Sequence, residues 1–381
     1  MKTVCAPNSC TGCMMCVSKC AKNAIRVEDG IKAFNAWIDE TQCINCGLCE
    51  QGCPSNHPIE KYTPSLWKQG WASNEYARLA GSSGGAASAI GNAFIKDGGT
   101  VCACVFDRGA LVFEFVNKVE ATKKFAGSKY VKSNPSGIYP KLKKLLQEGK
   151  RVLFIGLPCQ VAAVQRYTNH HPELYTIDLI CHGTPSEKLL RQFLSEKKID
   201  IQKMCDLKFR KKDEFYLSDA DKRIVPPSVF DQYTYAFLRG LCYTEACYSC
   251  QYAEISRVSD ITLGDSWGSQ LPIEEQKKGV SLIFCQTEKG KQMLDLADVH
   301  LEDVDVNVAV ENNKQLQKPS SKPNKYNLFW KTFFHTGKFC VAVDICYPIV
   351  FFKQKVKAVL IRVGILKRGD RRQRFTYQKG D

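Results

Sequence analysis

The sequence predicts a protein of the α+β or α/β class whose central layer is a mixed sheet. Strand-like and helix-like runs alternate between residues 81 and 320, a cysteine-dense segment precedes them, and a basic segment with helical spacing follows them. The chain has 381 residues, of which 44% are hydrophobic, so it is long enough for two or three domains. We expect four segments: a cysteine-rich domain at 1–58, a connector at 59–80, a core at 81–320 and a basic helical tail at 321–381.

The elements of the core are predicted in order along the chain. "TVCACVF" and "ALVFEFV" flank the turn at Asp107–Gly109, which is typical of a hairpin, and "IYPKLKKLLQEG" has helical spacing that stops at Gly149. "RVLFIG" predicts a buried strand, "QVAAVQRY" a helix and "LYTIDLIC" a second strand. This order predicts a parallel strand pair with a right-handed crossover, and "SDITLGD" and "GVSLIFCQT" predict later strands of the mixed sheet.

Cysteine usage sets the expected compartment and chemistry. The chain has 20 cysteines, and its opening stretch "MKTVCAPNSC" lacks the apolar core of a secretory signal, so we expect a cytoplasmic protein. In the reducing cytosol, thiols bind metals or carry out redox chemistry. A disulfide scaffold is therefore disfavoured.

Two cysteine runs of identical spacing lie in the first segment. "CTGCMMCVSKC" and "CINCGLCEQGCP" both follow the C-x-x-C-x-x-C-x-x-x-C pattern of bacterial ferredoxins, in which three ligands come from one run and the fourth from the other. Zinc is the alternative, but zinc sites usually show two ligand pairs. We expect a ferredoxin domain with two 4Fe–4S clusters, one held by Cys10, Cys13, Cys16 and Cys53 and the other by Cys43, Cys46, Cys49 and Cys20, with Cys5 as a spare thiol.

A second set of cysteines lies in the core. Cys159 in "GLPCQ" and Cys181 in "DLICHGTP" each close a strand of the predicted parallel pair, so both thiols emerge at the carboxyl edge of the sheet, where α/β proteins bind ligands. "CYSC" adds Cys247 and Cys250 at two-residue spacing. These four thiols predict a third cluster, with Cys242 as the reserve ligand.

Other roles for these thiols stay open at this point. Cys159 at a helix start could be a nucleophile, which would need a partnered base, and His182 is the only histidine in a comparable motif. The remaining cysteines lie in apolar runs and are expected to be core residues: Cys102, Cys104, Cys205, Cys285, Cys340 and Cys346.

A glycine-rich helix start opens the core. "AGSSGGAASAIGNAFIKDGG" places serines and glycines from Ser82 to Gly85 before a helix, where unpaired backbone N–H groups would suit a phosphate. The spacing is not G-x-G-x-x-G and no strand directly precedes it, so a Rossmann site is not predicted. An ordinary serine-capped helix is the alternative, and beside redox clusters a flavin diphosphate is the natural anion.

The order of these motifs resembles the coenzyme F₄₂₀ hydrogenase/dehydrogenase beta-subunit family over residues 1–320. The resemblance rests on the two ferredoxin runs followed by "GSSGGAASA", "GSKYVKS", "GLPCQ", "ICHGTPS", "CYSCQYA" and "SDITLGDSWG". It implies a flavin-binding core that carries its own 4Fe–4S cluster and receives electrons from the ferredoxin domain. It also implies that Ser83, Gly84, Gly85 and Ser88 face the phosphates of FAD, that Lys129 and Asp265 lie in the flavin pocket, and that Cys159, Cys181, Cys247 and Cys250 hold the core cluster.

The resulting expectation is an iron–sulfur flavoprotein oxidoreductase. Electrons would pass between a ferredoxin-type carrier or partner redox subunit and FAD, with hydride transfer to or from a small organic substrate, either a deazaflavin coenzyme or a polysaccharide-pathway metabolite. No acid/base pair is evident; His182 is a candidate proton donor or a structural turn residue. The alternatives are a non-catalytic electron-transfer subunit that feeds a partner enzyme, and a zinc-stabilised binding module.

The tail holds most of the positive charge. Residues 321–381 contain 14 Lys or Arg and 3 Asp, a net charge of +11 out of the +15 of the whole chain. No charge-free run is long enough to span a membrane. An apolar stripe lies beside basic residues, which predicts a helix on the anionic inner face of a membrane or, alternatively, one packed on the core. The stripe consists of Val356, Val359, Leu360, Val363 and Leu366, and the basic residues are Lys355, Lys357, Arg362 and Arg372. Nucleic-acid binding is not predicted, because no aromatic and basic interleaving supports it.

Overall fold

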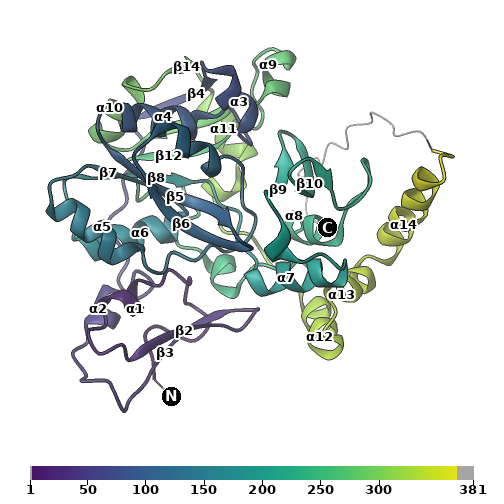
Figure 1. Ribbon diagram of the computed structural model, residues 1–381, viewed down its shortest axis with the longest axis horizontal. Helices are drawn as coiled ribbons and strands as arrows, with labels where there is room; N and C mark the ends of the chain where they lie inside the picture. Colours follow the sequence, from purple (N-terminus) through teal and green to yellow (C-terminus); the bar gives the residue numbers. More distant parts are fainter. Residues whose placement is uncertain (1, 367–381) are drawn as a thin grey trace.

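The computed structural model describes residues 2–366 and shows a larger lobe, a smaller lobe beside it and an amino-terminal unit below (Figure 1). The larger lobe is built on an eight-stranded mixed sheet in the order β14-β4-β13-β12-β8-β7-β5-β6. Its strands are β4 (Leu66–Ala72), β5 (Thr100–Asp107), β6 (Ala110–Val116), β7 (Val152–Gly156), β8 (Leu174–Leu179), β12 (Ile261–Asp265), β13 (Ser281–Cys285) and β14 (Val299–Glu302).

The predicted strand pairings are confirmed. β5 and β6 form the antiparallel hairpin, and β7 pairs with β8 in parallel, from Val152 with Leu174 to Gly156 with Asp178. β5 and β12 extend this parallel centre on either side, and the remaining pairs of the sheet are antiparallel. The carboxyl ends of β7, β8 and β12 therefore meet at one edge of the sheet.

Helices cover both faces of this sheet (Figure 1). One face packs against α4 (Ala86–Lys96) and α10 (Glu288–Asp295), and the other packs against α5 (Ile138–Gln147) and α6 (Pro158–Thr168). The period-two pattern of the strands explains this, since Val101 of β5 is buried in the first layer and the neighbouring Cys102 in the second. The sheet is thus the central layer of a three-layer sandwich.

The amino-terminal unit has a small sheet and two short helices. Its strands β1 (Lys2–Thr3), β2 (Ile25–Asp29) and β3 (Phe34–Ile38) form an antiparallel sheet in the order β1-β3-β2. The helices α1 (Met15–Lys19) and α2 (Leu48–Gly52) each start just after the second cysteine of a run. The core of this unit consists largely of cysteines with Val4, Ile25 and Phe34.

The smaller lobe has its own sheet and an aromatic core. The strands β9 (Leu207–Lys211), β10 (Glu214–Asp219) and β11 (Lys222–Arg223) form its sheet, and its helices are α7 (Glu187–Glu196), α8 (Gln232–Leu238), α12 (Tyr326–Thr336) and α13 (Phe339–Cys346). Phe193, Tyr233, Phe329 and Phe339 meet in its centre.

The remaining elements are short, apart from α14. They are α3 (Glu75–Ala80), α9 (Ile273–Lys278), α11 (Val306–Asn312), α14 (Pro348–Arg362) and the 3₁₀ turns η1 (Val119–Phe125), η2 (Ile201–Lys203), η3 (Glu245–Ser249) and η4 (Lys314–Leu316).

Two of the predicted segments differ from the structure. The connector expected at 59–80 contains β4, which lies between β13 and β14 inside the main sheet and pairs with both. The tail expected at 321–381 is not one uniform element: α12 and α13 fill the core of the smaller lobe, whereas α14 buries only Phe351. Both differences arise from pairing with distant segments, which local composition does not reveal.

We expect Phe339→Ala to lower the free energy of unfolding by about 3–5 kcal/mol, because it leaves a cavity among fully buried aromatic rings. Chemical denaturation of the full chain measures this change. Phe334→Ala removes the same side chain from an exposed position on α12 and should cost less than about 1 kcal/mol. Equal effects of the two substitutions would mean that α13 contributes nothing to the core.

Candidate functional site

The cysteines of the amino-terminal unit form two groups, as their spacing predicts. Burial, followed by the charges of Cys10 and Cys53, raises the pKa of the Cys13 thiol to about 12, and Cys16 lies in the same surroundings. Burial, together with nearby Cys20 and Cys43, also raises the pKa of Cys49. Thiols therefore come together across the two runs, with Cys53 beside the first run and Cys20 beside the second.

The two groups differ in exposure. All four thiols of the first group, Cys10, Cys13, Cys16 and Cys53, are buried, whereas Cys46 of the second group is exposed and Cys20, Cys43 and Cys49 are half-buried. Ile44 and Leu48 beside the second group are also exposed, at 60% and 46%. The first group therefore faces the core and the second faces solvent.

The amino-terminal unit is fixed onto the larger lobe at the first group. The Tyr139 hydroxyl of α5 donates to the Cys13 carbonyl oxygen, and Arg166 of α6 donates to the carbonyl oxygen of His57 at 2.6 Å. Cys159 of α6 is close enough for its charge to raise the pKa of Cys13. The buried amino-terminal thiols and the core thiols are therefore neighbours.

The four core cysteines come together from three distant segments. Cys159 lies in the first turn of α6, Cys181 follows β8, and Cys247 and Cys250 lie in and after η3. Burial, then the charges of Cys247, Cys159 and Cys250, raises the pKa of Cys181. The Thr184 N–H donates to the Cys247 sulfur at 3.4 Å. The four thiols are therefore neighbours near the carboxyl edge of β7 and β8, and their role as one ligand set stays a prediction.

A buried ion pair ties these segments together. Arg257, which follows the CYSC segment, donates to the Asp178 carboxylate of β8 at 3.0 Å, and both side chains are buried. Arg257 also donates to the carbonyl oxygens of Tyr252 and Leu179. Burial raises the pKa of Asp178, and the charge of Arg257 opposes that rise. The pair therefore fixes the loop of Cys250 against the strand that leads to Cys181.

Lys132 supplies a buried cation to the core thiols. Its ammonium lies 3.5 Å from the Cys159 sulfur, and its backbone N–H donates to the Pro185 carbonyl oxygen at 2.9 Å. Burial lowers the pKa of Lys132, but the charges of Cys159, Cys247 and Cys181 outweigh that effect and raise it. Four thiolates with bound iron carry negative charge, and a fixed ammonium offsets part of it.

The choice between zinc and a four-iron cluster rests on the cysteine spacing. Within residues 2–366 no three His, Cys, Asp or Glu side chains are arranged to hold one metal ion. A four-iron cluster is larger than a single ion and takes one thiolate at each iron, so it suits thiol groups that surround a space. Cys242, the reserve ligand, is instead fully buried in the aromatic core of the smaller lobe.

A cavity of about 290 Å³ lies between the two lobes, next to the core thiols. This volume is close to the lower end of the range for small-molecule and cofactor sites, roughly 300–1,000 Å³. Its wall includes most of the predicted flavin residues, namely Ser83, Gly85, Ser88, Lys129 and Asp265, together with His182 and the cluster ligand candidate Cys181. One space thus contacts the glycine-rich helix start and one of the core thiols, Cys181.

The glycine-rich segment forms the start of α4, and one prediction for it is wrong. Gly85, Ala86 and Ala87 line the cavity. Gly84 does not: its N–H donates to the Ser281 hydroxyl at 3.0 Å, and a Cβ there would lie 2.4 Å from the Gly70 carbonyl oxygen. Gly84 is therefore required by close packing against β4 and β13, and not by a phosphate. The Ser83 hydroxyl likewise donates to the Val280 carbonyl oxygen at 2.7 Å.

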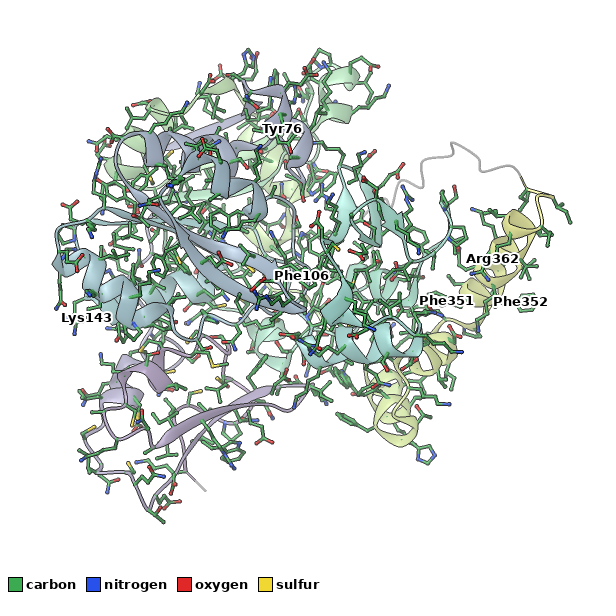
Figure 2. All side chains as sticks on the ribbon, in the orientation of Figure 1. Tyr76, Phe106, Lys143, Phe351, Phe352 and Arg362 are labelled. Carbon is green, nitrogen blue, oxygen red and sulfur yellow. The ribbon has the colours of Figure 1, made fainter. Side chains whose placement is uncertain are left out.

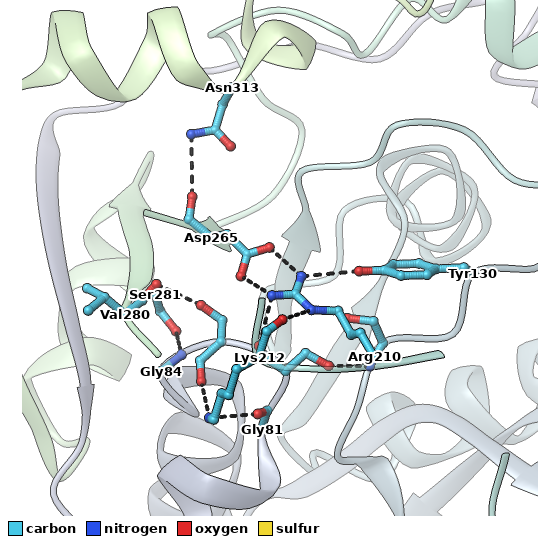
Figure 3. A network of polar contacts seen from close by, with 12 residues as sticks. Gly81, Gly84, Tyr130, Arg210, Lys212, Asp265, Val280, Ser281 and Asn313 are labelled. Atoms are coloured by element: carbon cyan, nitrogen blue, oxygen red, sulfur yellow. Dashed lines mark hydrogen bonds and ion pairs between the residues drawn. The ribbon is translucent and has the colours of Figure 1, made fainter. Parts of the chain in front are cut away.

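The smaller lobe closes this cavity through two basic residues of β9 and the turn after it (Figure 3). Arg210 donates to both carboxylate oxygens of Asp265, at 2.7 and 2.9 Å, and to the Tyr130 hydroxyl at 3.1 Å. Lys212 donates to the Gly81 and Ser83 carbonyl oxygens at 2.9 and 2.8 Å. The Asp265 carboxylate is thus engaged by Arg210, and Lys212 holds the glycine-rich loop in place.

Two further predicted residues, Lys129 and His182, also line the cavity. The Lys129 ammonium donates to the carbonyl oxygens of Phe125 and Ala126 at 2.8 and 3.0 Å, and burial lowers its pKa. Burial lowers the pKa of His182 to about 4. Because His182 lines the cavity, its role as a proton donor stays a prediction.

Sequence reasoning did not find Lys132, Arg210 or Lys212. Lys132 lies in the same "GSKYVKS" motif as Lys129, so this motif contained a second lysine that could have been predicted as a site residue. Arg210 and Lys212 lie in the basic run "KFRKK", which looks like a solvated strand end. Their partners are more than 50 residues away along the chain, at Asp265 and in the glycine-rich loop.

The chain matches known proteins in both cysteine-bearing regions. A family model for the carboxyl-terminal part of the coenzyme F₄₂₀ hydrogenase/dehydrogenase beta subunit matches residues 149–306, and one for a 4Fe–4S dicluster domain matches residues 9–57. A ferredoxin-like protein in the nif region of Trichormus variabilis is 35% identical over 75 residues, which cover 18% of this chain and 60% of that protein. An uncharacterized protein in the rpl9-rpl11 intergenic region of Porphyra purpurea is 36% identical over 64 residues, 16% of this chain and 85% of that protein.

Solved structures also match, and one of them covers most of this chain. It is the F₄₂₀-reducing NiFe hydrogenase complex from Methanosarcina barkeri, derivatized with xenon. The match has a TM-score of 0.48 at 16% sequence identity, and it covers 73% of this chain and 95% of that one.

Arg210→Met should lower the free energy of unfolding by about 3 kcal/mol, because it leaves the Asp265 carboxylate without its charged partner at the cavity wall. Thermal and chemical denaturation of the full chain measure this. Lys208→Met removes a cation from the same strand, where its pair with Asp206 is exposed, and should cost less than about 1 kcal/mol. A change no larger than that of the control would show that the Arg210 contacts do not stabilise the closed cavity.

Proposed function

The chain belongs to the coenzyme F₄₂₀ hydrogenase/dehydrogenase beta-subunit family, and from this premise we propose that it is an iron–sulfur flavoprotein oxidoreductase. The amino-terminal domain is of the 4Fe–4S ferredoxin type. In the proposal this domain holds two clusters in the thiol groups described above, and Cys159, Cys181, Cys247 and Cys250 hold a third. FAD occupies the cavity between the lobes.

The observation that carries the proposal is that Cys181 and the first turn of α4 line the same cavity. A helix start with free N–H groups suits a diphosphate, and the mostly apolar lining suits a ring system. Bound FAD would supply the step between single-electron carriers and two-electron hydride chemistry. Cys181 would hold the third cluster directly beside it.

In the proposal, electrons pass through the three thiol groups in the order in which these groups lie in the structure. The exposed group around Cys46 is open to a donor, the buried group that contains Cys13 adjoins Cys159, and Cys181 of the core group reaches the cavity. Lys132 stabilises negative charge on the core group. Arg210 and Lys212 hold the smaller lobe against Asp265 and the glycine-rich loop.

The partner and the substrate are proposed more broadly. The exposed apolar side chains of Ile44 and Leu48 beside the solvent-facing group suit contact with a ferredoxin-type carrier or a partner redox subunit. This surface also favours the second candidate, a non-catalytic subunit that feeds electrons to a partner enzyme. For the enzyme, the substrate is a deazaflavin coenzyme or a polysaccharide-pathway metabolite.

We also propose that the protein works in the cytoplasm, at the inner face of a membrane. No helix within residues 2–366 combines the length and the apolar character that crossing a bilayer requires. The proposed contact is therefore peripheral and is made by the tail.

Anaerobically purified protein should be brown and contain about twelve irons and one flavin per chain, since three four-iron clusters are proposed. Metal analysis and flavin extraction measure both. With a reduced ferredoxin as donor, the isolated chain should reduce a small organic acceptor, with flavin reoxidation as the signal. Cofactors at these levels without any acceptor reduction would favour the electron-transfer subunit, and protein without flavin would overturn the proposal.

Cys159→Ser should lower the iron content from about twelve to about eight per chain and leave the ferredoxin clusters in place. Electron paramagnetic resonance of the reduced protein shows which cluster has been lost. Cys205→Ser is the matched control, because Cys205 is exposed and lies outside all three groups. If Cys159→Ser kept full iron but lost activity, Cys159 would be a nucleophile.

A further inference from the structure

The apolar residues of α14 lie on a face that the protein body leaves uncovered. Ile349, Phe352, Val359 and Val363 are 69%, 70%, 56% and 61% exposed, and Val356 between them is also exposed. Their spacing alternates between three and four residues, so they form one stripe along the helix. We propose that this stripe docks onto an anionic lipid surface. The inference rests on the peripheral location proposed above and names the face of the protein that makes the contact.

The opposite side of α14 is anchored to the smaller lobe, so the apolar face points away from it. Phe351 is buried, the Gln354 side chain accepts from the Phe230 N–H at 3.1 Å, and Lys357 donates to the Ser228 carbonyl oxygen at 2.6 Å. Lys355 pairs with Asp344 of α13 at 2.6 Å. Figure 2 shows Phe351 on the side of the lobe and Phe352 on the other side of the helix. These contacts present the stripe in a fixed orientation.

The apolar surface extends past both ends of the helix. Ile345 of α13 precedes it at 47% exposed, and Ile365 and Leu366 follow it, also exposed. With 15 residues, α14 is shorter than the roughly 20 apolar residues that span a bilayer. A helix of this length with one apolar face lies in the plane of the membrane surface.

The charges around the stripe favour anionic lipid over a second copy of the chain. Lys353 is exposed on one flank of the stripe and Arg362 on the other, and residues 345–366 contain no Asp or Glu. Two copies packed stripe to stripe would bring like charges together, because neither helix offers an acidic partner. Headgroups of anionic lipids provide negative charge at the depth where these side chains end. Arg372, which the sequence analysis added to this set, lies outside the described residues.

The test uses point substitutions in the full, cofactor-loaded chain, because removing everything after Asn324 would also remove the core helices α12 and α13. The variant Phe352→Asp with Val359→Asp places acids in the stripe without touching buried residues. Leu296→Asp is the matched control, since Leu296 is an equally exposed apolar residue at the end of α10, and α10 lies far from α14 in Figure 1. The probe is sedimentation with vesicles of phosphatidylglycerol and phosphatidylcholine in equal parts, and with phosphatidylcholine alone.

The unaltered chain and Leu296→Asp should sediment with the anionic vesicles and much less with phosphatidylcholine alone. The double variant should bind the anionic vesicles at least about tenfold more weakly, because two apolar side chains lose their burial. Equal binding of the double variant, or no binding by the unaltered chain, would overturn the proposal. The proposal would also be overturned if the unaltered chain formed a dimer and the double substitution separated that dimer but left vesicle binding unchanged. Iron and flavin contents are measured in the same samples, so failure of the redox proposal would be seen separately.

Discussion

The ion pair between Asp178 and Arg257 is the interaction on which the core site depends. Neither side chain is accessible to water, and each charge would be costly to bury alone, so the pair keeps two distant segments in register. Asp178 comes from the parallel centre of the sheet, and Arg257 follows the loop that carries Cys247 and Cys250. Thr262 of the next strand also donates to Asp178, at 2.7 Å. The proposed third cluster would take its ligands from three segments, and the ion pair holds two of these segments together.

A similar connection joins the two lobes. Arg210 and Lys212 extend from the smaller lobe to Asp265 and to the glycine-rich loop of the larger lobe, and the cavity lies between these contacts. The aromatic core under β9 includes α12 and α13, so residues from the basic end of the chain support the cavity wall from behind. This explains why a segment with the composition of a tail is needed for the closed site.

The three thiol groups differ in burial. The outermost group is open to solvent, the next is buried against α5 and α6, and the core group lies beside the cavity. Exposed thiols are accessible to a partner, whereas buried ones sit where nearby charges such as Lys132 act more strongly. The exposed outer group is therefore accessible to a partner, the middle group is buried, and the core group is half-buried beside the cavity.

Local spacing was enough to predict the two amino-terminal thiol groups, the hairpin of β5 and β6, and the parallel pair that brings Cys159 and Cys181 to one edge. These features depend on residues a few positions apart or on a single crossover, whose hand is fixed by the twist of the strands. The insertion of β4 between β13 and β14, the packing of Gly84, and the ion pairs of Arg210 and Arg257 each join segments far apart in sequence. For the same reason the sequence predicted only part of the exposed stripe of α14: it included Leu360, which is half-buried, and missed Ile349 and Phe352. A helix with an apolar stripe fits a core or a membrane equally well, and only the contacts of Phe351, Gln354 and Lys357 decided which side of the helix stayed uncovered.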